Sequence, residues 1–307
     1  MLKCRFTFLL VFLSLFMSFS VQARLLLVVS QDSGLYQQFE SGFEDGLNEL
    51  GNALVIKRAD KLDKLVMDPF KVVVVAGVEA AKALYEHPPR NVHVLYTLMP
   101  RSSYARLKDK GMLVGRSHVL YIDQPPYRFV RLVKTAMPEI EKLGFLSGEE
   151  SIEHAQDIVQ EAVDFQLQVF TSQVDADIKF NSVLKQVLSP SEALLVLPDP
   201  YLYNRRAIQA VLLASFRHQK PLFAYSESFV KAGALAALYS TPSQIGRFSA
   251  ELAECMYDIC KLQKPAKFYP KYFSVSVNEV VARQLGLSID TAGRLEKALQ
   301  VLESQIN

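Results

Sequence analysis

The stretch LLVLPDPYLYNRRAIQAVLLASFRHQKPLFAYSESFVKAGALAALYS, residues 194–240, decides the fold of this chain. An apolar run from Leu194 to Leu197 meets a polar turn, a helical pattern follows through Phe216, and a second apolar run covers Leu222 to Tyr225. This order predicts a strand, a crossover helix and a second, parallel strand. Polar residues gather just past the carboxyl ends of both strands, where open α/β sheets bind ligands. We therefore expect the functional residues in these loops.

Two series of apolar runs, alternating with helical patterns such as the one over 37–50, extend this unit over most of the chain. The runs of the first series are 25–29, 53–56, 72–76 and 92–96, and those of the second are 143–146, 167–170, 194–197 and 222–225. Each series supplies the strands of one parallel sheet. The expected fold class is α/β, with two doubly wound, Rossmann-like lobes.

A final helical pattern places Leu295, Leu299 and Leu302 on one face after residue 287. We expect this helix to pack on the second lobe. The alternative is a helix that docks onto a partner.

The N-terminus has the features of an export signal. Lys3 and Arg5 precede an apolar run from Phe6 to Phe19, and Val21-Gln22-Ala23 is a small-x-small cleavage site. The run is short for a membrane span, which needs about 20 residues. We expect cleavage after Ala23 and export to the periplasm, with an uncleaved anchor as the alternative. Cys4 precedes the apolar run, so it is not the lipidated cysteine of a lipoprotein.

Charge argues against a nucleic-acid partner. The formal net charge is +2, and removal of residues 1–23 takes away two basic residues and no acidic ones, which leaves zero. Neither nucleic acid nor an anionic membrane is therefore expected to bind by general electrostatic attraction.

Cys255 and Cys260 remain after cleavage and lie on one predicted helix. On an unbroken helix this spacing holds their Cα atoms beyond the reach of a disulfide. We expect free thiols, with a disulfide as the alternative.

Several motifs resemble one known family. They are a Pro-Asp turn after a buried strand (198–199), KPLFA (220–224), SFVKAGALAAL (228–238), GRFSAELA (246–253), and KPA (264–266) followed by Asn278 and ARQLGL (282–287). Through these motifs, most of residues 24–288 resembles the ABC-transporter substrate-binding family that includes tryptophan- and phenylalanine-binding proteins. The resemblance implies a type I periplasmic binding protein with a hinge.

In that family the chain crosses between the lobes three times. With the export signal at 1–23, the resemblance thus implies lobe 1 at 24–117 plus 242–266, and lobe 2 at 118–241 plus 267–307. A cleft between two lobes binds small molecules by enclosing them.

The candidate ligand-binding residues lie in the loops that follow the predicted strands. In lobe 1 they are Ser30, Asp32, Ser33, Gly77 and Glu79, and in lobe 2 they are Glu149, Ser151, Asp199, Tyr201, Ser226 and Glu227. Capping of a helix accounts for one of the serines of 30–33, and a helix start is an alternative role for Glu149. Tyr201 could stack on a flat ligand or lie on the surface.

Where this chain has Gly77-Val78-Glu79-Ala80, family members commonly carry Gly-Thr-Pro-Ala. The change places a carboxylate near a helix N-terminus, where it repels an anionic ligand. A cationic or neutral ligand fits better, as does a cleft that has lost its original ligand. We further expect Asp32, Glu79, Asp199 and Glu227 to face one another across the lobes and to oppose closure unless a cationic or donor-rich ligand is bound or protons are taken up.

Catalytic and metal-binding motifs are missing from the sequence. The five histidines form no H-E-x-x-H pair, and there is no G-x-S-x-G, G-x-x-x-x-G-K-S/T or strand-linked G-x-G-x-x-G. We expect no enzyme activity, no metal and no cofactor. The expected function is that of a monomeric periplasmic protein that delivers a small ligand to an ABC permease. The alternatives are a ligand-sensing module for a membrane sensor kinase or receptor and, third, an enzyme on an α/β scaffold.

Overall fold

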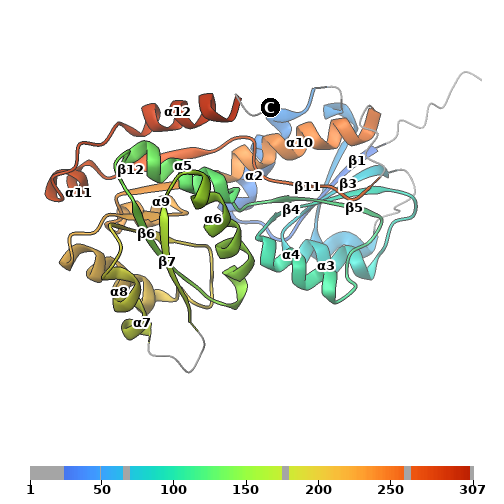
Figure 1. Cartoon of the computed structure of the whole chain (residues 1–307). Coiled ribbons are helices and arrows are strands. Elements are labelled where there is room, and N and C mark those ends of the chain that lie inside the picture. Colours follow the sequence, from blue (N-terminus) through green and yellow to red (C-terminus); the bar gives the residue numbers. More distant parts are fainter. Residues whose placement is uncertain (1–23, 49, 65–69, 175–179, 259–263, 305–307) are drawn as a thin grey trace, which may run out of the picture.

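The computed structural model describes residues 24–48, 50–64, 70–174, 180–258 and 264–304. These residues form two α/β lobes that stand side by side (Figure 1). The sheet of lobe 1 contains β1 (Arg24–Val29), β2 (Leu54–Arg58), β3 (Phe70–Ala76), β4 (His93–Met99), β5 (Arg116–Tyr121) and β11 (Lys267–Phe268). The sheet of lobe 2 contains β6 (Lys142–Ser147), β7 (Gln168–Gln173), β8 (Ala193–Val196), β9 (Leu222–Ala224), β10 (Ala236–Tyr239) and β12 (Ser274–Val277).

The strand order is that of two doubly wound sheets. Lobe 1 has the order β11-β5-β4-β3-β1-β2, and lobe 2 has the order β12-β10-β9-β8-β6-β7. The described pairs are parallel except β10 with β12, which is antiparallel. The expected fold class is confirmed.

Helices cover both faces of each sheet. Those of lobe 1 are α2 (Gly34–Gly46), α3 (Val78–Glu86), α4 (Arg101–Asp109) and α10 (Pro242–Asp258), with the 3-10 turns η1 (Gly51–Ala53) and η2 (Ala59–Lys64). Those of lobe 2 are α5 (Pro126–Ala136), η3 (Glu149–Ser151), α6 (Ile152–Asp164), α7 (Phe180–Leu188), α8 (Arg205–Arg217), α9 (Glu227–Lys231), α11 (Glu279–Gln284) and α12 (Ala292–Ser304).

The central strands are apolar on both faces because helices cover both. Along β1, Leu26 and Val28 pack on the side of α3, while Leu25, Leu27 and Val29 pack on the side of α2 and α10. Each such side chain contributes about 1.5–3 kcal/mol on full burial. This two-sided burial explains why the strands are continuous apolar runs rather than alternating ones.

Two glycines allow α10 to lie directly on α2. A Cβ at Gly42 would come within 2.1 Å of the carbonyl oxygen of Ser243, and one at Gly246 within 2.1 Å of the carbonyl oxygen of Phe39. The two backbones therefore touch, which only glycine permits at these places. This contact fixes α10, which follows lobe 2 in the sequence, to lobe 1.

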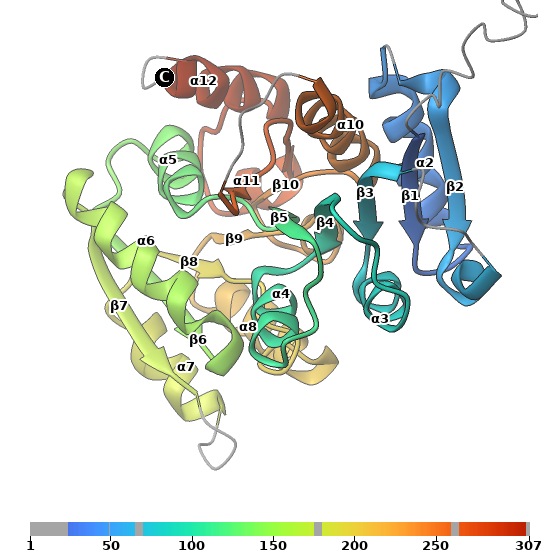
Figure 2. The same ribbon diagram turned by 90° about the vertical axis from the view of Figure 1, so that its right-hand side faces the viewer.

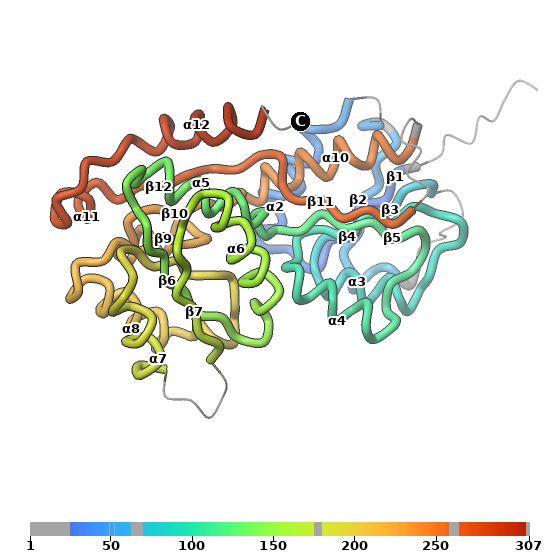
Figure 3. Tube along the Cα trace, in the orientation of Figure 1, coloured from blue at the N-terminus to red at the C-terminus, as the bar shows by residue number. Residues whose placement is uncertain are grey.

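The chain crosses between the sheets after β5, again through α10 to β11, and a third time from β11 to β12 (Figure 3). The sheet of lobe 1 continues past residue 117 to Tyr121, and it takes in Lys267 and Phe268, because β11 pairs with β5. The sheet of lobe 1 therefore extends a few residues past the predicted boundaries at 117 and 266. The division into domains itself stays a prediction.

The C-terminal helix packs on lobe 2, as expected from its apolar spacing. Leu295 and Leu299 of α12 are fully buried in the core of that lobe. Buried Arg128 of α5 adds a polar contact, because its Nη2 donates to Glu303 Oε2 at 2.8 Å and its Nη1 to the carbonyl oxygen of Pro270 at 3.0 Å.

Two local expectations were wrong. The helix expected over 37–50 spans Gly34–Gly46. The chain after it is held by α10, because the backbone N–H groups of Asn48 and Leu50 donate to the carboxylate of Glu254 on that helix. Cys255 is disulfide-bonded rather than free. The spacing argument assumed an unbroken helix through residue 260, and residues 259–263 lie outside the described residues.

Cys4 and Cys260, and the predicted export signal at 1–23, lie outside the described residues. Within the described ranges, no helix combines the length and apolar composition that a membrane crossing requires.

Candidate functional site

An ion pair joins α4 of lobe 1 to α6 of lobe 2. Strands such as β1 and β7 point their carboxyl ends toward the same side of the molecule (Figure 2). The loops that follow β1, β3 and β4 lie on the lobe 1 side, and those that follow β6, β8 and β9 on the lobe 2 side. Open parallel sheets place their ligand sites at such ends.

Ser30 and Gly77 form one local unit after β1 and β3. The Ser30 hydroxyl donates to the carbonyl oxygen of Ala76 at 3.0 Å and accepts from the backbone N–H of Ala80 at 3.0 Å, so it caps α3. Gly77 has φ +93°, and a Cβ there would lie 2.4 Å from both Ser30 Oγ and the Tyr36 hydroxyl oxygen. The backbone of Gly77 therefore lies close to the hydroxyls of Ser30 and Tyr36. Capping of α3 accounts for the role of Ser30.

The other lobe 1 candidates are polar groups near helix starts. Asp32 is exposed, accepts from Gln37 Nε2 at 3.0 Å and lies 3.5 Å from Arg58 Nη2. Ser33 is the N-cap of α2 but makes no side-chain capping bond. Glu79 is exposed and pairs with Lys82 at 2.7 Å.

Asp199 and Ser151 join the loops after β8 and β6. The Ser151 hydroxyl donates to Asp199 Oδ2 at 2.8 Å and accepts from the backbone N–H of Gly148 at 3.0 Å. The other oxygen of Asp199 accepts from the backbone N–H groups of Tyr201 and Leu202. Asp199 is 1% exposed. These bonds use its carboxylate to hold two loops together.

The remaining lobe 2 candidates are exposed or partly exposed. Tyr201 is 73% exposed, and Glu149 begins η3. The Ser226 hydroxyl lies 2.8 Å from that of Ser228, and Glu227 pairs with Lys231 at 2.8 Å.

The expected group of four facing carboxylates is not seen among the described contacts. Asp32, Glu79 and Glu227 each lie beside a cation of their own lobe, and Asp199 is held by a hydroxyl and two amides. The expectation was based on the four negative charges alone and did not include the cations and hydrogen-bond donors beside them. Their combined repulsion is therefore much smaller than four bare charges would give.

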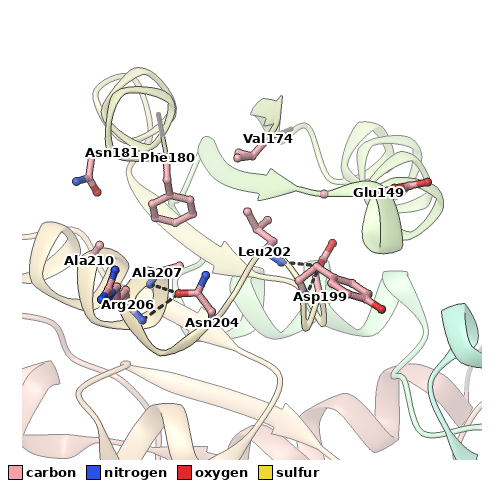
Figure 4. A pocket seen from close by; sticks show the side chains of 12 residues that line it. Glu149, Val174, Phe180, Asn181, Asp199, Leu202, Asn204, Arg206, Ala207 and Ala210 are labelled. Atoms are coloured by element: carbon pink, nitrogen blue, oxygen red, sulfur yellow. Dashed lines mark hydrogen bonds between the residues drawn. The ribbon is translucent and has the colours of Figure 1, made fainter. Parts of the chain in front are cut away.

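A cavity of about 700 Å³ lies on lobe 2, beside the loops after β6, β7 and β8 (Figure 4). Phe180 and Tyr201 supply aromatic surface, and Asn181 and Arg206 supply polar groups. Asn204 caps α8 by accepting from the N–H groups of Arg206 and Ala207 at 3.0 and 3.1 Å. Of the candidate residues, Glu149, Asp199 and Tyr201 line this cavity.

A second, smaller cavity of about 210 Å³ lies between the lobes. On the lobe 1 side it is lined by α4, and on the lobe 2 side by η3 and the start of α6. Of the candidate residues, only Glu149 borders it.

Ion pairs cross between the lobes beside this cavity. Arg101 at the start of α4 reaches Asp157 of α6 through Nη1 at 2.7 Å and Glu153 through Nη2 at 2.9 Å. Burial alone would lower the pKa of Arg101, but the hydrogen bond to Asp157 and the nearby acidic charges more than compensate and raise it. Arg106 pairs with Glu150. Charged side chains of the protein itself thus link the two lobes.

Two buried ionisable groups lie against the same cavity. Asp123, in the first crossing segment, accepts from the backbone N–H of Arg101 at 2.7 Å, and burial raises the pKa of this carboxyl. Burial, together with the positive charge of Arg101, lowers the pKa of His154 to about 4. His154 is therefore neutral at physiological pH.

Several residues beside this cavity were not predicted from the sequence: Arg101, Arg106, Asp123, Glu153, His154 and Asp157. The signal that would have found Arg101 is its position directly after Met99-Pro100, at the carboxyl end of a predicted strand. That is the rule that selected the other loops.

The structure also brings His93 and His118 together on β4 and β5, with Nδ1 and Nε2 3.2 Å apart. Among the residues that the structure describes, no group of three or more metal-ligating side chains occurs.

Comparisons with known proteins agree with this architecture. A family model described as ABC transporter substrate binding protein matches residues 107–297. A comparison with curated proteins yields no match.

Solved structures share the fold over most of the chain. A substrate-binding protein with adhesive properties from Clostridium difficile, in its ligand-free, open form, has a TM-score of 0.66 at 14% identity and covers 87% of this chain and 96% of its own. An ABC domain from Streptococcus pneumonia in complex with L-Trp has a TM-score of 0.56 at 18% identity, with 89% and 98% covered. A conserved domain protein from Vibrio cholerae O1 biovar eltor has a TM-score of 0.56 at 17% identity, also with 89% and 98% covered.

At these identities the likeness shows a shared fold, the type I periplasmic binding protein architecture. The family model spans more than half of the chain and includes the crossing segments and most of lobe 2. The chain belongs to the ABC transporter substrate-binding protein family, a class of periplasmic proteins that bind small molecules rather than transform them.

Proposed function

We propose that this protein encloses a small ligand between its two lobes and delivers it to an ABC permease in the membrane. The observation that carries the proposal is the set of ion pairs from α4 to α6, beside a cavity that both lobes line. Hinged lobes that meet through their own side chains can close over a ligand and open to release it. The family membership supports the same role.

The protein acts in this proposal by binding, without covalent chemistry, and works in the periplasm after removal of residues 1–23. The loops after β1, β3, β6, β8 and β9 form the walls of the binding cleft. Ser30, Ser151 and Asp199 shape these walls through their internal hydrogen bonds. Glu149 and Tyr201 have side chains free enough to meet a ligand.

Ligand binding tests the proposal directly. A thermal-shift screen of amino acids, amines, sugars and organic acids should give at least one compound that raises the melting temperature, since a ligand at 100 times its dissociation constant adds about 2.7 kcal/mol. Small-angle scattering with that compound should show a smaller radius of gyration. A ligand that stabilises the protein without changing its radius would contradict enclosure between the lobes.

A sensory role is the second candidate. The polar groups of the cleft loops are largely engaged with neighbours of their own lobe, which suits a site altered from that of a transporter. Uptake measurements separate the two roles. Deletion of the gene should abolish cellular uptake of the identified ligand if the protein serves a permease, and should leave uptake intact if it reports to a membrane receptor.

A further inference from the structure

The cavity between the lobes contains two buried polar atoms without a partner. Glu150 Oε2 and His154 Nε2 are both inaccessible, and neither has a hydrogen-bond partner among the described residues. Both residues line the cavity, from the start of α6 and the turn before it. His154 is 5% exposed. Buried polar atoms are nearly always paired in native proteins, so two unpaired atoms on residues that line one cavity indicate a bound group.

The cations beside the cavity are already engaged. Arg106 pairs with the other oxygen of Glu150, and Arg101 pairs with Glu153 and Asp157. Among the described residues that line the cavity, no cation is therefore left to satisfy Glu150 Oε2. Acidic side chains outnumber basic ones along the lining, since Asp109, Asp123 and Glu149 also border the cavity.

Both vacant hydrogen-bonding positions can accept a hydrogen bond. A carboxylate oxygen can only accept, and a neutral imidazole accepts at Nε2 when its proton is on Nδ1. Burial lowers the pKa of His154 to about 4, which keeps the ring neutral. An anionic group would meet Glu150 and Glu149 at close range and be repelled.

Resting on the proposed function, we propose that this cavity receives a primary ammonium group of a cationic ligand, which donates to Glu150 Oε2 and His154 Nε2. The ammonium group has three donors and no acceptor, which matches two acceptors and a net acidic lining. A volume of about 210 Å³ is below the usual range of about 300–1,000 Å³ for whole ligands. The cavity therefore holds the charged end of the ligand, and the rest extends along the cleft.

Matched small molecules test the chemistry. Binding of 1,4-diaminobutane, 1,4-butanediol and succinate to the purified protein would be measured by calorimetry and thermal shift at pH 7.5. The three share a four-carbon skeleton and differ in the charge of their ends. We expect the diamine to bind and to raise the melting temperature, and the diol and diacid to bind at least about tenfold more weakly.

Variants test the residues. Glu150→Gln keeps the shape of the side chain but weakens the acceptor, and it should lower the affinity for the diamine about tenfold. The matched control is Glu279→Gln, which removes the charge of an exposed glutamate on α11 that does not border this cavity and should change affinity by less than about threefold. His154→Phe removes the second acceptor and should also weaken binding, which keeps the test available if Glu150→Gln does not fold.

The outcomes separate this inference from the proposed function. Equal binding of the diol or diacid, or an unchanged diamine affinity in both Glu150→Gln and His154→Phe, would show that the cavity holds solvent alone and would overturn the inference. If a different class of compound then binds and contracts the protein, ligand enclosure stands without the ammonium site. If no compound of any class binds, both fail.

Discussion

Removing Arg101 should shift the two lobes toward an open arrangement. Its guanidinium is 26% exposed and lies within 3 Å of both Asp157 and Glu153, whose side chains are 46% and 71% exposed. Pairs of this exposure contribute about 0.2–1 kcal/mol each. The two together therefore stabilise contact between the lobes by about 1 kcal/mol.

This energy is enough to change populations measurably. About 1 kcal/mol is a factor of roughly five in an equilibrium constant. A protein with four closed molecules to each open one would become roughly an equal mixture on Arg101→Gln. Adding Arg106→Gln, which removes the pair with Glu150, should shift the equilibrium by a similar factor again.

Small-angle scattering measures this shift as an increase in the radius of gyration. In the unmodified protein, raising the salt concentration to 1 M should act in the same direction, because the screening length falls to about 3 Å. Arg294→Gln is the matched control, since Arg294 pairs with Asp290 four residues away in the same lobe. An unchanged radius in the double variant and in high salt, or an equal change in the control, would refute the role of these ion pairs.

Three further outcomes follow from local contacts. Lowering the pH from 6.5 to about 4 should lower the free energy of unfolding by about 3 kcal/mol through His154. The reason is that the unfolded chain binds a proton at this residue, whereas the folded protein, in which the pKa is lowered, does not. In denaturant unfolding experiments across this pH range, the free energy of unfolding of His154→Phe should depend less steeply on pH. Gly77→Ala should lower the free energy of unfolding by at least about 2 kcal/mol, since φ is +93° at this residue and the new Cβ would collide with two hydroxyls. Gly34 has open space around it, so Gly34→Ala should leave the melting temperature nearly unchanged. Gly246→Ala should cost about 2–3 kcal/mol by forcing α10 away from α2, and an unaltered denaturation midpoint would show that the helices can separate freely.

The buried strands could be predicted from sequence because both of their faces are covered. Runs such as Val72 to Ala76 are apolar at every position, and no other element competes for that pattern at this length. β5 was missed because Arg116, Ser117 and His118 interrupt its apolar pattern. β10 was missed because it is rich in alanine, which has little intrinsic preference for strands.

The loops of the candidate site could be predicted, but the roles of their side chains could not. The position of a loop depends on strand order, which the alternating pattern shows. The role of Asp199 depends on Ser151, which is 48 residues away in the sequence and comes close only through the pairing of β6 with β8. The pairing of Arg101 with Asp157 depends in the same way on how the two lobes face each other. Contacts of this kind follow from tertiary structure and leave no local signal.

The local partners of these carboxylates bear on the electrostatics of closure. Carboxylates counted in the loops suggest that the lobes repel each other until a cation is bound. In the folded protein three of these carboxylates have a cation of their own lobe beside them, and the pairs that cross between the lobes, at Arg101 and Arg106, are attractive. Closure then needs no ligand charge to overcome repulsion. In our proposal, selectivity arises instead from two acceptors that closure leaves unpaired, Glu150 Oε2 and His154 Nε2. A ligand that donates hydrogen bonds to these atoms offsets the free energy cost of burying them. A ligand without such donors leaves the cost uncompensated.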